Sequence, residues 1–363
     1  MIHLKQISLT RLFVLVVLTQ IGVHVLSIPY EESRKSGYDA WISVLVGGAI
    51  AQAAILIIYA LGKNYADQPF PRYLSSIVGK PLASILNILL AVYFLESSLL
   101  VTVSYTDVIN RWVLFTTPWF VIFGFMLFIA AYIASSSLRS LAVVSQTIMV
   151  MFLIGCAIVI FSGGLEEGDF RHFLPIGAHG AGSIMLDSFR AFWAYAGYEL
   201  LLYVFPYVKY RKKRDVLIAL SAANGVTTLF YLLISVIVLY SLSENQLRFV
   251  PEPMVFILRQ FKWPVVQNLD ILFMMLWLSV TLVTAYVYLF MAARYLAFVG
   301  TKEIQKHTLL VWILAFLCFA AGFWGSDRHR MLQFANYHNT STAIAIVLIP
   351  TILLIVSRIR RGR

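Results

Sequence analysis

The stretch that decides the fold reads Phe189-Arg190-Ala191-Phe192-Trp193-Ala194-Tyr195-Ala196-Gly197-Tyr198-Glu199. It lies inside an apolar segment of membrane length, yet it holds an arginine, a glutamate, a glycine and five aromatic side chains. An uncompensated charge at membrane depth costs at least ~2.5 kcal/mol, so a lipid-facing helix would not retain Arg190 and Glu199. Gly197 allows the backbone to leave helical geometry. We therefore predict a helix that is interrupted near the middle of the bilayer, with its freed backbone groups turned toward a ligand.

The composition indicates a polytopic membrane protein. Of the 363 residues, 60% are hydrophobic and 12% are charged, whereas soluble domains are roughly half apolar and about a quarter charged. The net charge of +11 is explained by basic cytoplasmic loops, so we expect no nucleic-acid partner. Cys156 and Cys318 lie in separate apolar segments and predict neither a disulfide framework nor a metal site. The sequence contains no recognisable set of catalytic residues and no cofactor-binding motif, so we expect neither enzymatic activity nor a cofactor.

Charge-poor stretches long enough to span a bilayer, roughly 20 residues each, recur along the whole chain. They cover residues 12–30, 40–62, 81–109, 112–135, 141–163, 183–208, 216–241, 271–293, 308–325 and 340–356. The sequence therefore predicts an all-α integral membrane protein, a single membrane domain over residues 1–363 with about ten transmembrane helices. Between the seventh and eighth segments, the apolar run 255–258 is expected to belong to a short interfacial helix.

The basic residues predict the orientation. With the N-terminus inside, 18 of the 28 lysines and arginines fall in inner connections and nine in outer ones, while Arg190 lies within the membrane. Because positive residues concentrate on the cytoplasmic side, both termini are expected there.

The first segment carries a second candidate interruption. Gly22 lies near its middle, beside the polar residues Thr19, Gln20 and His24. A lone glycine also serves simple helix–helix contact, but Gly197 stands at an equivalent depth five segments later. Paired interruptions in corresponding segments point to a transporter-type site between two inverted halves, here 12–163 and 183–356. Half-helix N-termini suit a carboxylate and unwound carbonyls suit an ammonium group, so the pair suits a zwitterionic amino acid.

Several stretches resemble one family over nearly the whole chain. They are residues 21–29 and 37–45, Ala191-Phe192, Gly197-Tyr198-Glu199, residues 205–209 and 269–273, Trp277, and Tyr286-Val287-Tyr288. In order and spacing they resemble the B subunits of bacterial spore germinant receptors, the endospore germination permeases. That family is similar to the amino acid–polyamine–organocation transporters. His24 departs from the family, which more often has a small or apolar residue after the break.

The resemblance implies a five-plus-five inverted repeat with broken first and sixth helices. It also implies a permease-like subunit in the inner membrane of the spore that binds a small nutrient, such as an amino acid, and triggers germination. The implied partners are an A subunit with large soluble regions and a lipoprotein C subunit. The alternative function is a proton-coupled amino acid transporter, and a channel or membrane scaffold is a third class.

The candidate ligand-binding residues come from the first, third, sixth and eighth segments. They are Thr19, Gln20, Ile21, Gly22, Val23, His24, Ser97, Phe192, Tyr195, Gly197, Tyr198, Glu199, Thr281 and Thr284. Phe192 and Tyr195 are the aromatic residues expected to point into the pocket. Two alternatives stay open: Thr281 and Thr284 could bond only to their own helix, and His24 could simply link two helices.

Three further ionisable residues, Glu96, Asp187 and Arg190, are expected to form a gating or charge network. Arg190 is three residues from Asp187 and therefore shares its helix face. Its expected partner is Asp187 or Glu96. Glu96 could instead carry a coupled proton, and Glu199 could either close the site or pair with a neighbouring helix.

Overall fold

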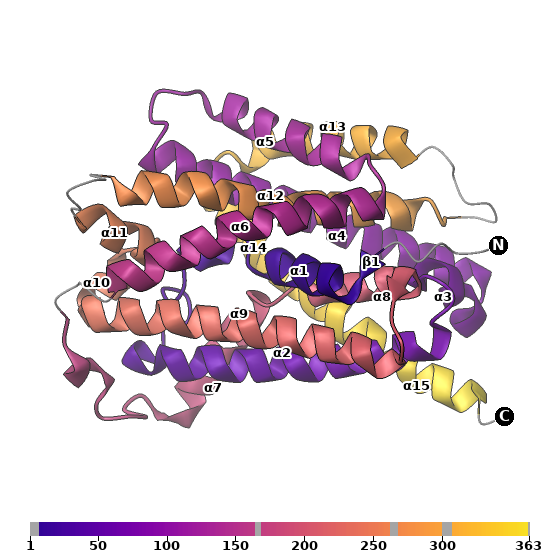
Figure 1. Ribbon diagram of the computed structural model, residues 1–363, viewed down its shortest axis with the longest axis horizontal. Coiled ribbons are helices and arrows are strands. Elements are labelled where there is room, and N and C mark those ends of the chain that lie inside the picture. Colours follow the sequence, from indigo (N-terminus) through magenta and orange to yellow (C-terminus); the bar gives the residue numbers. More distant parts are fainter. Residues whose placement is uncertain (1–6, 164–167, 262–267, 300–306, 362–363) are drawn as a thin grey trace.

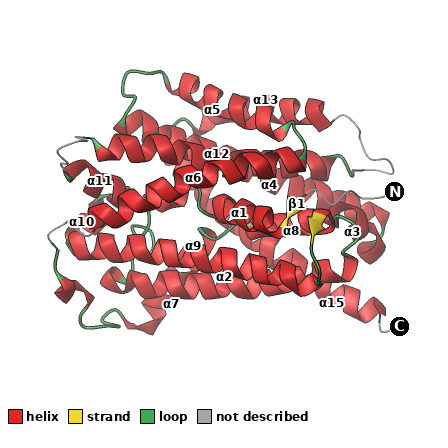
Figure 2. Ribbon diagram, in the orientation of Figure 1, coloured by secondary structure: helices red, strands yellow, loops and turns green. Residues whose placement is uncertain are grey.

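The computed structural model describes residues 7–163, 168–261, 268–299 and 307–361. These residues form a bundle of helices, most of which run along the long axis of the molecule (Figure 1). Figure 2 shows helices throughout the bundle and two short strands near one end. β1, near the start of the chain, and the last turn of α15 lie at the same end of the bundle, on the right of Figure 1.

In chain order, the first half contains α1 (Leu9–Gln20), α2 (Ala40–Gly62), α3 (Phe70–Val78), α4 (Lys80–Trp112), α5 (Trp119–Ala134) and α6 (Leu138–Gly163). The second half contains α7 (Gly180–Trp193), α8 (Leu201–Val204), α9 (Lys213–Ser241), α10 (Glu244–Phe249), α11 (Pro253–Gln260), α12 (Leu269–Leu296), α13 (His307–Gly325), α14 (Arg328–Thr342) and α15 (Ile349–Arg361). Proline stands in the first turn of α3, α4 and α11, where a missing N–H leaves no helical bond unmade.

Among the described residues, seven helices are long and apolar enough to cross a membrane. They correspond to the second, third, fifth, seventh, eighth, ninth and tenth predicted segments. The fourth segment forms the shorter α5, and the first and sixth segments are interrupted.

Two predicted boundaries were wrong. The fourth helix begins at Trp119, because Trp112 still belongs to α4. The tenth begins at Arg328 and continues from α14 through a π-helical turn into α15. Its first half is polar, so hydropathy placed the start only at Thr340.

The short helix expected around residues 255–258 is α11 (Pro253–Gln260), and it is packed within the bundle. Val255, Ile257 and Leu258 are fully buried, and the helix packs against α9 and α12. Its apolar side chains are therefore covered by protein rather than by lipid.

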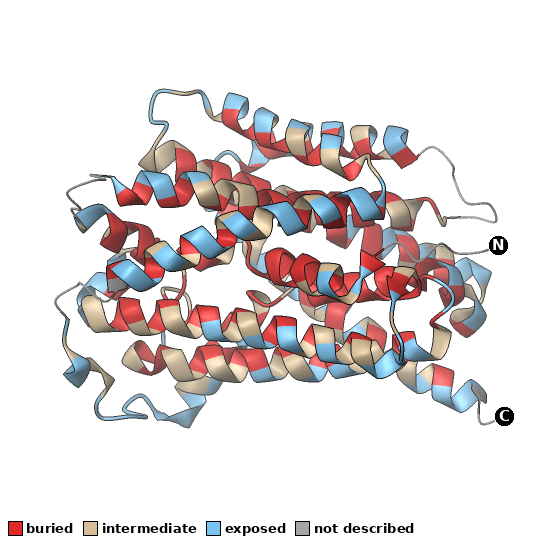
Figure 3. Ribbon diagram, viewed as in Figure 1, coloured by how far each residue is buried: buried red, intermediate tan, exposed pale blue. Residues whose placement is uncertain are grey.

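The most buried part of the bundle lies around α1 and α8, which belong to the two interrupted helices. Figure 3 shows α1 and α8 buried almost throughout, while the outward sides of α5 and α13 are exposed. Phe125 and Phe316 on those two helices are 68% and 70% exposed. Large apolar side chains facing outward on long apolar helices are what a lipid environment requires.

Two short strands join the interrupted helices at the end that holds the termini. β1 (Ile7–Ser8) leads into α1 and pairs in parallel with β2 (Val208–Lys209), which follows α8 and a 3₁₀ turn. Ile7 and Val208 are partners in this pair, and both are fully buried. The main chain before α1 is thus tied to the main chain after the sixth helix.

Candidate functional site

The first and sixth helices are both interrupted at the predicted glycines. α1 stops at Gln20, and after Gly22 the chain resumes as a 3₁₀ turn, Val23–Leu26. α7 stops at Trp193, and a 3₁₀ turn leading into α8 starts after Gly197. Gly197 has φ +136°, a conformation that other residues rarely adopt.

The two interruptions touch through their main chains. A Cβ atom on Gly197 would lie 2.8 Å from the backbone nitrogen of Gln20 and 2.9 Å from the carbonyl carbon of Thr19. Both distances are too short for a real side chain. Glycine is therefore needed at Gly197 for the sixth helix to approach the first this closely.

The eighth helix, α12, supplies donors to the first interruption. The hydroxyl of Thr284 lies 3.2 Å from the carbonyl oxygens of both Leu18 and Thr19. The indole N–H of Trp277 donates to the carbonyl of Gly22 at 3.2 Å. Thr281, also buried, has no hydrogen-bond partner for its hydroxyl among the described residues. Thr284 thus bonds across to the first helix, and Thr281 keeps a free hydroxyl beside it.

Glu199 connects the second interruption to two other helices. Its carboxylate accepts hydrogen bonds from the hydroxyls of Tyr93 on α4 at 3.0 Å and Tyr288 on α12 at 2.9 Å. The other oxygen accepts from the backbone N–H of Gly197 at 2.6 Å. Glu199 is 1% exposed, and these three donors give both of its carboxyl oxygens a hydrogen-bond partner. The carboxylate therefore fixes the geometry of the turn that contains Gly197.

Glu96 faces the tenth helix rather than Arg190. A carboxylate oxygen of Glu96 lies 3.5 Å from Nδ1 of His338, and the hydroxyl of Ser97 lies 3.2 Å from Nε2 of the same ring. The ring also stacks on Tyr93. His338 and Glu96 therefore lie beside Tyr93, which bonds Glu199 at the second interruption.

Arg190 pairs with Asp187, one of its two expected partners. The guanidinium donates to Asp187 at 2.5 Å. The second carboxylate oxygen of Asp187, which is fully buried, accepts from the backbone N–H groups of Lys35 and Ser36, each at 2.8 Å. Asp187 therefore ties the chain that follows the first interrupted helix to α7.

The predicted aromatic residues are buried, but they do not all point toward the interruptions. The hydroxyl of Tyr195 donates to the carbonyl of Val44 on α2 at 3.0 Å, and the backbone nitrogen of Phe192 also lies against α2, at Gly47. Tyr195 therefore turns its hydroxyl toward α2. Tyr198 is buried, and its hydroxyl has no partner among the described residues.

The polar residues before the first interruption are also engaged. Thr19 bonds back to the carbonyl of Leu15 at 2.6 Å, within its own helix. Gln20 reaches across to the sixth helix, where its amide donates to the carbonyl of Tyr195 at 2.9 Å. Ile21 is fully buried and Val23 is half-buried.

Four residues that complete this arrangement were not among the predicted site residues, namely Tyr93, Trp277, Tyr288 and His338. Trp277 and Tyr288 were named only in the stretches that carry the family resemblance. Tyr93 and Tyr288 each lie one helical turn from a predicted site residue, Ser97 and Thr284, and that spacing was the available signal. His338 was missed because the tenth helix was predicted to begin after it.

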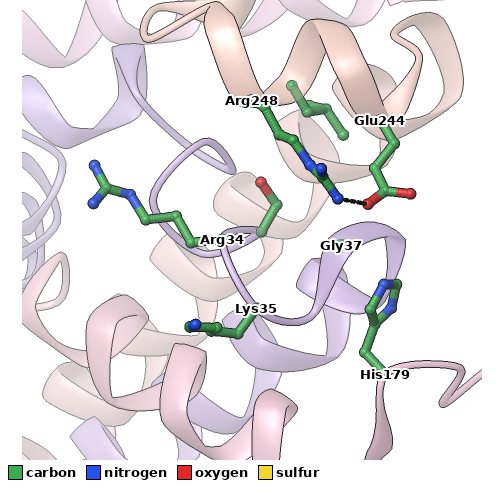
Figure 4. A pocket seen from close by; sticks show the side chains of 8 residues that line it. Arg34, Lys35, Gly37, His179, Glu244 and Arg248 are labelled. Atoms are coloured by element: carbon green, nitrogen blue, oxygen red, sulfur yellow. Dashed lines mark hydrogen bonds and ion pairs between the residues drawn. The ribbon is translucent and has the colours of Figure 1, made fainter.

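A separate surface pocket lies beside the segment that leads into α2. Half of its eight lining residues are charged (Figure 4); the lining consists of Ser33, Arg34, Lys35, Gly37, His179, Glu244, Leu247 and Arg248. Arg248 pairs with Glu244 at 2.7 Å, as the dashed line in Figure 4 marks. None of its lining residues belongs to either interruption.

Comparison with a known fold gives the same arrangement of helices. A structure of MhsT in complex with L-phenylalanine superposes with a TM-score of 0.67, covering 94% of this chain and 87% of that one at 14% identity. At this identity the likeness shows the fold alone.

Comparisons of sequence identify relatives along nearly the whole chain. Spore germination protein GerQB of Bacillus cereus is 26% identical over 341 residues, covering 93% of this chain and 90% of that protein. Spore germination protein YndE of Bacillus subtilis is 23% identical over 306 residues, covering 83% and 82%. Spore germination protein B2 of Bacillus subtilis is 22% identical over 353 residues, covering 96% and 93%. The sequence model of the family described as spore germination protein matches residues 6–328, and this multi-pass membrane protein therefore belongs to that family.

Proposed function

We propose that this chain is the permease-like subunit of a nutrient germinant receptor, which binds a small nutrient between its two interrupted helices. The observation that carries the proposal is the contact between the interruptions, where Gly197 meets the backbone of Thr19 and Gln20. Membership of the spore germination family supports a role in germination. A ligand bound at this contact would favour one arrangement of the two helices by its differential affinity.

The nutrient we propose is an amino acid. Interrupted helices present N–H groups to a carboxylate and carbonyls to an ammonium group. Near the interruptions, the hydroxyls of Thr281 and Tyr198 are buried without a partner among the described residues, and buried hydroxyls in that condition favour a polar ligand. MhsT, which shares the fold, was solved with L-phenylalanine.

The proposed setting follows from the family and the arrangement of the chain. The protein would lie in the inner membrane of the spore with both termini cytoplasmic, and its partners would be the A and C subunits of the receptor. Residues 12–163 and 183–356 would be the two inverted repeats, each starting with an interrupted helix. The position of β1 and the last turn of α15 at one end of the bundle (Figure 1) supports placing both ends of the chain on the same side of the membrane.

A proton-coupled amino acid transporter is the second candidate, and the observation in its favour is the Glu96–His338 pair. A carboxylate and an imidazole in contact inside a membrane protein are suited to carrying a proton. A transporter would require this pair for uptake, whereas a receptor requires only binding.

The proposal is tested by germination. Spores that lack this chain, and the same spores complemented with it, are exposed to the standard amino acids and to sugars at graded concentrations. The proposal predicts that complementation restores the response to at least one amino acid, and that Gly197→Ala raises the concentration needed. It is refuted if the two spore types respond identically to every compound.

A further inference from the structure

The seventh predicted segment, α9, carries polar side chains on the face that it turns to the interrupted helices. Ser221, Asn224, Thr228 and Tyr231 recur at helical spacing, and Thr227 lies beside them. Asn224, Thr227 and Tyr231 are buried. Burying a polar group within a membrane helix costs free energy unless the group is paired, so such groups usually mark a functional contact.

Tyr231 contacts the main chains of both interruptions. Its hydroxyl lies 2.9 Å from the carbonyl oxygen of Gln20, the last residue of α1, and 3.1 Å from that of Ala194, which follows α7. A tyrosine hydroxyl has one proton and donates to one acceptor at a time. It can therefore serve both carbonyls only while the two interruptions stay within a narrow distance of each other.

The side chain of Gln20 makes a second contact between α9 and the first interruption. Thr227 donates to the side-chain oxygen of Gln20 at 3.0 Å, and the amide of Gln20 donates to the carbonyl of Tyr195 at 2.9 Å. Gln20 is therefore fixed by α9 on one side and by the sixth helix on the other.

The same face of α9 continues to α2. Asn224 donates to the carbonyl of Gly48 at 3.0 Å, and Gln52 donates to the hydroxyl of Ser221 at 2.8 Å. At Gly48 a Cβ atom would lie 2.5 Å from the hydroxyl of Thr228, so these two helices are packed as closely as glycine allows. A shift of α9 would therefore move α2 with it.

We propose that Tyr231 is a positioning residue that sets the distance between the two interruptions and transmits changes in that distance through α9 to α2. This inference deepens the proposed function, because the distance it sets is that of the proposed ligand site. Tyr231 itself need not touch the ligand. Loss of its hydroxyl leaves the carbonyls of Gln20 and Ala194 without their shared donor, so both interruptions become mobile together.

The test uses hydrogen exchange of the full chain, purified and reconstituted in lipid nanodiscs without ligand. Tyr231→Phe is compared with Tyr286→Phe, which removes a buried hydroxyl that contacts Ser145 rather than an interruption. We expect exchange in residues 19–24 and 194–199 to become roughly tenfold faster in Tyr231→Phe, the ratio that ~1.4 kcal/mol produces. Tyr286→Phe should leave both segments unchanged. Unchanged exchange in Tyr231→Phe, or an increase spread over the whole bundle, would overturn the inference.

A milder variant covers the case in which Tyr231→Phe does not fold. Thr227→Val removes the hydroxyl that holds Gln20 and should speed exchange in residues 19–24 but not in 194–199. Equal effects on the two segments would contradict the separate contacts described above.

Binding of the standard amino acids to the same preparations separates this inference from the proposed function. If the wild-type chain binds an amino acid, Tyr231→Phe should weaken that binding by roughly tenfold, and unaltered binding would overturn the inference. If the wild-type chain binds none, the proposed ligand class is wrong, and the exchange data still decide the role of Tyr231.

Discussion

Replacing Gly197 by alanine tests the contact between the two interruptions with a single methyl group. The residue sits at φ +136°, and holding a non-glycine residue in so sparsely populated a region costs about 1–3 kcal/mol. The new Cβ would also meet the backbone of Gln20 at 2.8 Å, and overpacking of this kind costs about 1–3 kcal/mol more. The backbone there cannot yield easily, because Tyr231 and Thr284 hold the residues around it.

The two costs together are about 2–6 kcal/mol against the arrangement in which the interruptions touch. Even the lower value corresponds to roughly a 30-fold change in an equilibrium. We therefore expect spores with Gly197→Ala to need at least about 30-fold more nutrient for half-maximal germination. As a control, immunoblotting compares the amount of the protein in the membranes of the variant and wild-type spores.

Two other glycines provide a graded control. A Cβ on Gly225 meets no atom within 4 Å, and alanine is favoured over glycine inside a helix by about 0.5–1 kcal/mol. Spores with Gly225→Ala should therefore show the wild-type nutrient response. A Cβ on Gly22 would lie 3.0 Å from the hydroxyl of Thr284, so Gly22→Ala should have an intermediate effect. A normal dose response in Gly197→Ala spores would refute the reasoning.

Three further variants, one of them with two substitutions, test other contacts in the structure. Glu199→Gln replaces a carboxylate that accepts three hydrogen bonds, and losing one charged bond costs about 1.5–3 kcal/mol. The half-maximal nutrient concentration should rise more than tenfold at an unchanged protein level, and an unchanged dose response would mark the residue as a spectator. His24→Ala should alter either the ranking of nutrients or the pH dependence of germination; if neither moves, the histidine only fills space between helices. Cysteines that replace Ile7 and Val208 and are oxidised to a disulfide should fix the pair of β1 and β2, and germination should be unchanged. Loss of the nutrient response on oxidation, and its return on reduction, would show that this end of the bundle must open.

The interruptions could be predicted because they break a strong local rule. Arg190, Glu199 and Gly197 in an apolar segment contradict a lipid-facing helix whatever the rest of the chain does. The paired glycine at Gly22 was found by its equivalent depth in the first segment. Such signals are contained in a few consecutive residues, and hydropathy is sufficient to detect them.

The side-chain partners could not be predicted in the same way, because they depend on how helices rotate after an interruption. Tyr195 follows α7 by two residues, and the sequence does not reveal that its hydroxyl turns to α2. The contact between Tyr231 and Gln20 joins residues 211 positions apart, beyond any periodicity. His338 lies in a polar half-helix that hydropathy assigned to a loop.

The central claim, that the interruptions bind a nutrient without carrying it across the membrane, is tested most directly in proteoliposomes. Radiolabelled amino acids that trigger germination are added to vesicles containing either the wild-type chain or Gly197→Ala, and bound and internalised label are counted separately. The account predicts saturable binding of no more than one molecule per chain, its loss in Gly197→Ala, and no label inside the vesicles. Accumulation of label in the vesicle interior, or binding that survives Gly197→Ala unchanged, would contradict it.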